Sequence, residues 1–250
     1  MSVLFLSSAT FGHLSDSGSS DLHQIKETIP QCYKKKYEQW KAEYLSTYVG
    51  QQEWQKFDHD RNFDLTITVT KEKGRGAEVI NLQWSAEGEL IAATIVLGSA
   101  LDSGYPGAFN YPVLCSLDPG SLSKGVPSDV LAASKLAHEF GHINNIARVG
   151  AATYNQQNDF IRQYNRIFFH NGMNAKDPRL LELLSRMGGS PVDIMRDREH
   201  EAEASSALYL KERLRTLNLN RPLSRSVGAA IELYEKIYQR SEYSYFNSPE

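Results

Sequence analysis

A pair of histidines separated by three residues, in the segment His138-Glu139-Phe140-Gly141-His142, constrains this chain more than any other feature. Side chains at i and i+4 project from the same side of an α-helix, so both imidazoles can reach one point if the segment is helical. The flanking residues favour that structure, since Ser128 can cap a helix that runs from Asp129 to Arg148 and ends at Gly150. Three residues would anchor the helix through a separate apolar face: Leu136, Phe140 and Ile143.

The spacing of His138 and His142 allows both imidazoles to bind one Zn²⁺, each at ~2.0–2.1 Å. Glu139 follows the first histidine, and a glutamate at this place in an H-E-x-x-H helix takes a proton from the metal-bound water. Two imidazoles and a carboxylate suit zinc, although iron, nickel or cobalt could use the same ligands. The alternative is an ordinary surface helix that carries two histidines and no metal.

A catalytic zinc takes three protein ligands and a water, so a third ligand must come from elsewhere in the chain. The longer pattern H-E-x-x-H-x-x-G-x-x-H is excluded because Asn145 and Arg148 occupy its glycine and last histidine positions. No glutamate occurs between His142 and Glu182, which excludes a nearby glutamate ligand. Asp159 remains as a carboxylate from the following helix.

The preferred third ligand is Glu199, in a second helix that begins at Ser190-Pro191 and runs to about residue 217. Glu199 and Glu203 fall on or beside the apolar stripe of this helix, whereas Glu201 is turned away by ~160° or more at 100° per residue. An inward-facing acid is costly unless it is paired or metal-bound. We therefore expect Glu199 to bind the metal and Glu203 to accept a hydrogen bond from a histidine N–H, with Glu203 as the next candidate ligand. Otherwise both acids belong to a charged face with i,i+4 pairs. The stripe consists of Met195, Ala202, Ala207, Leu210, Leu214 and Leu217.

The chain as a whole predicts an α+β fold with one folded domain. Residues 1–20 are expected to form an N-terminal segment with a flexible linker, and 21–250 a single domain. Within that domain we expect helices over 21–57, a small sheet over 63–100 and helices over 128–240. Breaks in the first helical region are expected near Pro30 and Gly50, and the strands are predicted at Leu65–Thr70, Val79–Trp84 and Leu90–Leu97. The last two flank Ala86-Glu87-Gly88-Glu89 and are expected to form a hairpin.

Charge and composition exclude several classes of protein. With 27 basic and 30 acidic residues the formal net charge is −3, which argues against a nucleic-acid partner. No apolar run approaches the ~20 residues of a membrane span, and the N-terminus lacks the basic and long apolar regions of a secretory signal, so we expect a soluble protein without an integral membrane segment.

Cys32 and Cys115 cannot form a four-cysteine metal site, and their pairing stays open. The acidic stretch Asp58–Asp64 resembles the start of a calcium loop but has Phe63 at the required glycine, which favours a turn.

The two motifs together resemble those of the gluzincin metallopeptidases, over about residues 131–214. The nearest pattern is E-x-E-A-D followed by small and apolar residues, as in CaaX-type endopeptidases and, more loosely, ImmA/IrrE-type peptidases. Here it reads Glu199-His200-Glu201-Ala202-Glu203, which carries the ligand role onto Glu199 and places Glu203 at the usual aspartate. The membrane helices of the CaaX-type enzymes are missing, so their prenylated substrates do not carry over.

The resemblance implies a zincin-like fold, in which a small, mostly antiparallel sheet packs on the active-site helix and an extended peptide lies along an edge strand, for which we expect Leu90–Leu97. It implies a zinc-dependent endopeptidase, with one zinc per chain, that acts on a peptide or protein substrate with Glu139 as general base. Tyr154, His170 and Tyr209 are available as oxyanion donors. The alternative is a zincin-fold binding or regulatory protein that holds zinc without significant proteolysis; a third hypothesis is a metal-free helical interaction protein.

Overall fold

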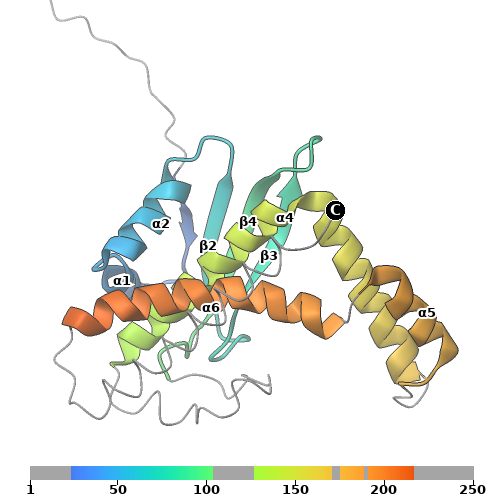
Figure 1. Ribbon diagram of the computed structural model, residues 1–250. Helices are drawn as coiled ribbons and strands as arrows, with labels where there is room; N and C mark the ends of the chain where they lie inside the picture. The colour runs from blue at the N-terminus through green and yellow to red at the C-terminus, as the bar shows by residue number, and fades with distance from the viewer. Residues whose placement is uncertain (1–23, 104–126, 171–174, 189–190, 217–250) are drawn as a thin grey trace, which may run out of the picture.

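The computed structural model describes residues 24–103, 127–170, 175–188 and 191–216 (Figure 1). Several expectations lie outside these residues: the N-terminal segment 1–20, the helical prediction beyond residue 216, Cys115 and the side chain of His170. Within the described residues no helix is both long enough and apolar enough to cross a membrane.

The four strands of the described residues all lie before residue 99, together with two short helices, and only helices follow them, so the α+β class is confirmed. In chain order the elements are β1 (Lys26–Thr28), α1 (Lys34–Tyr44), α2 (Tyr48–Asp58), β2 (Asp64–Thr70), β3 (Ala77–Trp84), β4 (Leu90–Gly98), α4 (Ser128–His170), α5 (Pro178–Met187) and α6 (Pro191–Thr216).

The sheet is mixed, which corrects the expectation of a mostly antiparallel one. Its strand order is β1-β2-β4-β3; β2 runs parallel to both β1 and β4, and only β3 and β4 are antiparallel. The cause is the connectivity. The helices α1 and α2 return the chain so that β2 starts beside β1 in the same direction. The hairpin then sends β3 to the outside, and β4 comes back between β3 and β2.

Because β4 lies in the interior of the sheet, the prediction that Leu90–Leu97 forms the edge strand is wrong. The exposed edge beside β4 belongs to β3, which is the other arm of the predicted hairpin. The pairing of β3 with β4 is regular from Ala77 to Ile80 and is then interrupted by a bulge. Asn81 lies at this interruption with φ 54°, a left-handed conformation that asparagine tolerates better than most residues.

The first predicted helical region contains a strand and two helices. Residues 26–28 form β1 rather than helix, because they pair with β2, where Lys26 is opposite Thr66. The break between α1 and α2 falls at residues 45–47, not at Gly50, since the Thr47 hydroxyl caps α2 by accepting the Gly50 N–H. Gly50 therefore lies in the first turn of α2, where a Cβ would collide with the Tyr44 carbonyl.

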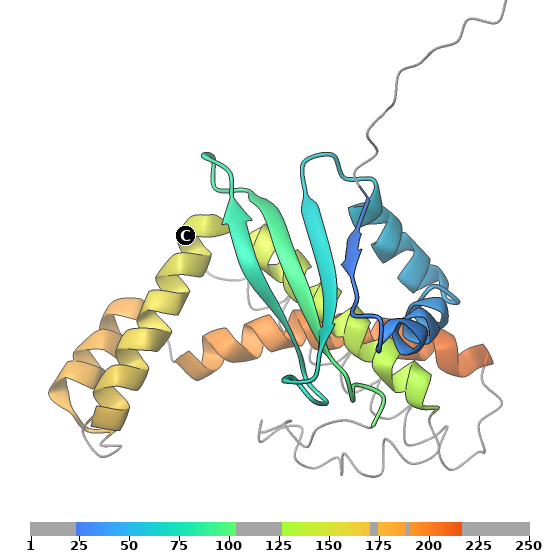
Figure 2. The ribbon, with the colours of Figure 1, turned by 180° about the vertical axis from the view of Figure 1, so that it is seen from behind.

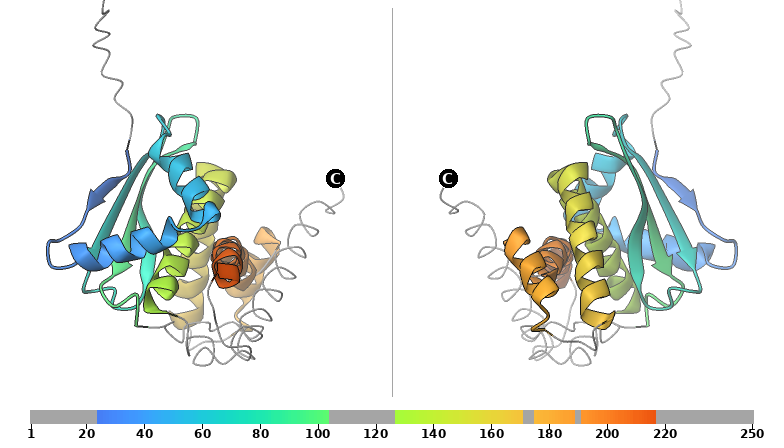
Figure 3. Two further views of the ribbon diagram at one scale, coloured as in Figure 1. Left: turned by 90° about the vertical axis from the view of Figure 1, so that its left-hand side faces the viewer. Right: turned by 90° about the vertical axis from the view of Figure 1, so that its right-hand side faces the viewer.

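The helices form layers on one face of the sheet, with α4 between the sheet and α6 (Figure 3). The anchoring face predicted for α4 is confirmed, since Leu136, Phe140 and Ile143 are completely buried. The Phe140 ring stacks on Tyr44 from α1 and on Phe57 from α2, with centroid distances of 5.6 and 5.3 Å. This cluster fixes the first half of α4 against the rest of the core.

Helix α4 is bent at Gly150, the residue at which the sequence predicted that the helix ends. A second helical stretch follows it directly. Gly150 has φ 73° and ψ 167°, and the next amide, of Ala151, donates to the Gly88 carbonyl in the β3–β4 turn at 3.0 Å. The second half of α4 and the adjacent α5 project from the body as a two-helix arm (Figures 1 and 2). Helix α5 falls within the region 128–240 that was predicted to be helical, although its bounds were not predicted. It begins with Asp177 as N-cap and ends at the left-handed Gly188.

Candidate metal centre

The three predicted metal ligands lie together on two crossing helices. His138 and His142 come from the first half of α4 and Glu199 from α6, and one ligand atom from each lies within 4.8 Å of the others. The Nε2 of His138 is 3.4 Å from Oε2 of Glu199, and the Nε2 of His142 is 3.7 Å from Oε1. Ligand atoms bound to a tetrahedral zinc are about 3.3 Å apart, given Zn–N bonds of ~2.0–2.1 Å. The group could therefore bind a metal ion after small side-chain adjustments.

The close crossing of α4 and α6 depends on small residues at the contact. A Cβ added to Gly141 would lie 2.7 Å from the Cα of Ala202 and 2.7 Å from the Oγ of Ser205. One turn further along α6, the Ser206 hydroxyl donates to the carbonyl of Ser134 at 2.6 Å. A glycine inside a helix weakens it by roughly 1 kcal/mol relative to alanine, so Gly141 signals a packing requirement.

Glu201 attaches α6 to α4 on the other side of this crossing. Its carboxylate accepts hydrogen bonds from Asn145 at 2.7 Å and from Arg148 at 2.8 Å. The sequence predicted that Glu201 points away from Glu199 and Glu203, but it did not identify these hydrogen-bond partners. Asn145 and Arg148 are the two residues that replace the glycine and the last histidine of the longer histidine pattern. The α4 helix thus uses Asn145 and Arg148 to hold the helix that carries Glu199.

Glu203 lies next to His138, but the predicted hydrogen bond between them is not formed, since the Nδ1 of His138 has no hydrogen-bond partner. Glu203 is buried, and its Oε1 is 3.7 Å from the Nδ1 of His138, the ring nitrogen that faces away from Glu199. A carboxylate beside the second nitrogen of a metal-binding histidine orients the ring and increases its basicity. By contrast Met195, which the sequence placed on the apolar stripe, is 45% exposed.

Other residues considered for the site lie elsewhere. Asp159 is on the exposed arm, where it pairs with Arg162 three residues on. Tyr209 is buried, but its hydroxyl donates to Glu43 of α1 at 2.9 Å and is engaged away from the histidines. Tyr154 lies beside Arg198, the residue that precedes Glu199.

In the acidic stretch Asp58–Asp64, the Asp58 carboxylate accepts the Ile25 N–H. The described residues contain no second group of metal-binding side chains.

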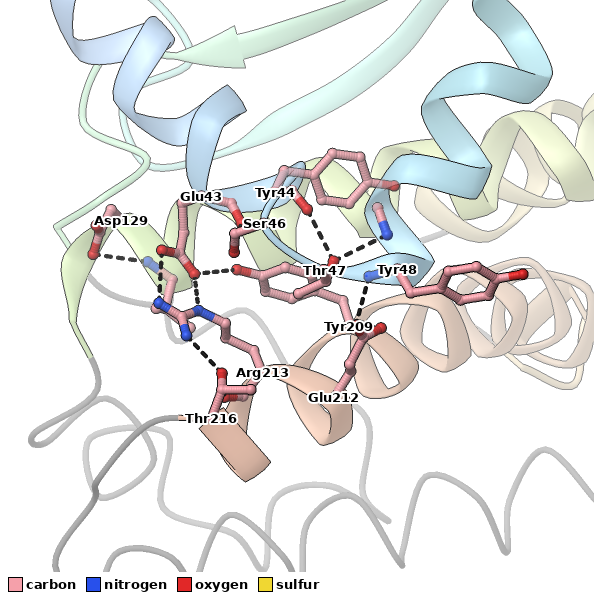
Figure 4. A network of polar contacts seen from close by, with 12 residues as sticks. Glu43, Tyr44, Ser46, Thr47, Tyr48, Asp129, Tyr209, Glu212, Arg213 and Thr216 are labelled. Atoms are coloured by element: carbon pink, nitrogen blue, oxygen red, sulfur yellow. Dashed lines mark hydrogen bonds and ion pairs between the residues drawn. The ribbon is translucent and has the colours of Figure 1, made fainter.

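The C-terminal half of α6 is fixed against α1 and α2 by a network of charged residues (Figure 4). The Glu43 carboxylate accepts hydrogen bonds from Tyr209 and Arg213. Glu212 accepts the amides of Tyr48 and Val49, at 2.5 and 2.9 Å, and so caps the start of α2. Helix α6 is therefore attached to α4 next to Glu199, through Glu201, and to α1 and α2 in its C-terminal half.

Burial controls the protonation of the site. Burial lowers the pKa of His138 well below its usual value and that of His142 to about 3, so both imidazoles are neutral near pH 7 and offer a lone pair. Burial raises the pKa of Glu139 to about 8, and the positive charge of Lys135 opposes this rise. A cation bound beside Glu139 would favour its carboxylate form.

One buried carboxyl atom fits a water beside a bound metal. Within the described residues, Glu139 Oε2 is buried without a hydrogen bond, which is uncommon for side-chain polar atoms. The charge of Glu199 contributes to the raised pKa of Glu139, which indicates that these two carboxyl groups lie close together. Two neutral imidazoles and a carboxylate form a donor set that zinc accepts.

No protein-family model, curated protein or solved structure matches this chain. The case for a function therefore rests on the sequence and on the geometry of the site.

Proposed function

We propose that this chain is a zinc-dependent endopeptidase with a zincin-like active site, in which His138, His142 and Glu199 hold the metal. The observation that carries the proposal is the approach of Glu199 from α6 to the two histidines of α4, 3.4 and 3.7 Å from their Nε2 atoms. Two helices distant in sequence thus bring three ligands together, with the acid needed for catalysis beside them. A purely structural zinc site has no need for Glu139.

Bound zinc would lower the pKa of a coordinated water and polarise a substrate carbonyl. Glu139 accepts the proton of the attacking water as the new C–O bond forms. It then returns that proton to the amine as the peptide C–N bond breaks, so that no net proton is gained or lost. Glu203 keeps the His138 ring oriented during this cycle.

The edge strand β3 is the favoured place for an extended peptide substrate. It packs against α4, and the charge of Glu78 on this strand is close enough to contribute to the raised pKa of Glu139. Among the described strands only β4 pairs with β3, so the backbone groups on the other side of β3 can pair with an extended peptide. The regular part, Ala77–Ile80, precedes the bulge and offers the ordered edge.

The test compares the wild type with Glu139→Gln, Glu199→Ala and a matched control, Glu182→Gln, which changes an exposed acid of α5. Bound metal is identified and counted by mass spectrometry, and hydrolysis is measured on a mixed peptide library. We expect one zinc per chain in the wild type, Glu139→Gln and the control, a much reduced content in Glu199→Ala, and no hydrolysis by Glu139→Gln. Hydrolysis that persists in Glu139→Gln, or a wild type that takes up no zinc, would contradict the proposal. Zinc without hydrolysis in the wild type would favour a zinc-holding binding or regulatory protein.

A further inference from the structure

We infer that Arg198 is a positioning residue that sets the place of Glu199 by attaching its helix to the second half of α4. The inference rests on the metal site of the proposed function and is independent of peptide hydrolysis. Arg198 directly precedes Glu199 in α6, so a displacement of one backbone position displaces the other.

The guanidinium of Arg198 is engaged by a set of acceptors on one helix. Its Nε and Nη2 donate to the side-chain oxygen of Gln157 at 3.1 and 2.8 Å, and its Nη1 donates to Asn158 at 2.8 Å. Nη2 also reaches the Tyr154 carbonyl at 3.4 Å. All these acceptors lie beyond the Gly150 bend, on the half of α4 that does not carry His138 and His142.

Arg198 is also packed against an aromatic ring. Its central carbon lies 4.4 Å from the ring centroid of Tyr154, a distance typical of cation–π contacts. Tyr154 in turn contacts Trp84 at the end of β3, with a centroid distance of 5.9 Å. The edge strand β3, the arm and α6 therefore come together at Tyr154 and Arg198, immediately beside Glu199.

The hydrogen-bond acceptors of Arg198 are neutral, which distinguishes its contacts from an ion pair. They are the side-chain amides of Gln157 and Asn158 and one backbone carbonyl, while partial burial lowers the pKa of the guanidinium. The planar donors of an arginine fix both distance and angle, which a lysine ammonium cannot reproduce. The arrangement suits orientation of the neighbouring ligand.

The experiment measures zinc affinity by competition with a chromophoric chelator in a double-mutant cycle. The proteins are the wild type, Arg198→Ala, Glu199→Ala and the double variant. Arg198→Lys serves as a conservative variant if the alanine protein does not fold. Arg162→Ala, on the exposed surface of the second half of α4, is the control. We expect Arg198→Ala to weaken zinc binding ~10-fold or more, Arg198→Lys to weaken it less, and the control to leave it unchanged.

The cycle separates positioning from general stabilisation of the fold. If Arg198 acts through Glu199, its replacement changes zinc affinity little once Glu199 is already alanine. An equal loss in both backgrounds, or no loss in the wild-type background, would overturn the inference while leaving the metal site in place. If Glu199→Ala itself bound zinc as the wild type does, the proposed metal site would fail instead.

Discussion

Gly141 of α4 and Ala202 of α6 lie so close that a Cβ on the glycine would be 2.7 Å from the Cα of the alanine. The H-E-x-x-H motif thus approaches, at Gly141, the backbone of the helix that carries Glu199. The distance between these two residues determines how far Glu199 can reach toward the histidines.

Replacement of Gly141 by alanine should therefore destabilise the protein even though alanine is the better helix former. Two of the three atoms that the new Cβ meets are backbone atoms of α6, so no side-chain rotation relieves the contact. We expect a loss of ~1–3 kcal/mol in unfolding free energy by urea titration, together with weaker zinc binding. Ala147→Gly, on the exposed side of α4, is the control that should lower stability without changing zinc affinity. Unchanged stability in Gly141→Ala would contradict the close crossing.

Glu203→Ala should weaken zinc binding ~10-fold, because the Nδ1 of His138 loses the carboxylate 3.7 Å away. Glu203→Gln retains an oxygen at this position and should lose less. Both affinities can be measured by competition with a chelator. Equal affinities for the wild type and Glu203→Ala would show that this acid has no part in holding the histidine.

Tyr209→Phe should lower the unfolding free energy by ~0.5–1.5 kcal/mol, since it removes a hydrogen bond to Glu43 and keeps the buried ring. Tyr48→Phe is the matched control, because Tyr48 is 66% exposed and is bound to Glu212 through its backbone amide. Urea denaturation followed by circular dichroism measures both. The prediction fails if the two phenylalanine variants are equally stable.

The start of α5 should depend on pH through Asp177. Its hydrogen bonds from Arg179, at 3.0 and 3.1 Å, and the cap to the Arg179 amide hold the pKa of this carboxyl below its usual value. A depressed folded pKa means that the stabilisation is complete above the unfolded value of ~3.9 and is lost as pH falls through the folded value. Amide hydrogen exchange in α5 should therefore accelerate in acid relative to neighbouring helices. Asp177→Asn should remove this difference; if the variant kept it, another acid would be responsible.

Local sequence patterns predicted the parts of the structure whose causes are local. The spacing of His138 and His142 required a helix, and the acid Glu199 beside an apolar stripe required an inward partner; the structure has both helices and brings these residues together. The turn at Gly88 likewise predicted the β3–β4 hairpin.

Features that depend on distant partners were not predicted. The apolar residues around β1 recur at helical spacing, and pairing with β2 some 40 residues later decides in favour of a strand. The interior position of β4 also depends on a distant partner, because the strand order is decided by whether β3 or β4 pairs with β2. The role of Arg198 was invisible because its acceptors lie about 40 residues earlier, on another helix.

The backbone of Gly150 is not helical, so the bend divides α4 into two helical halves that contact α6 at different places. The half before the bend carries the two histidines of the candidate metal site, the half after it carries the acceptors of Arg198, and α6 contacts both halves. A change of a few degrees in the backbone of Gly150 would therefore shift Glu199 relative to the histidines without altering any residue of the candidate site. If the site binds a metal as proposed, substitutions in the β3–β4 turn should change its affinity from a distance, because the Gly88 carbonyl accepts the Ala151 N–H at the bend.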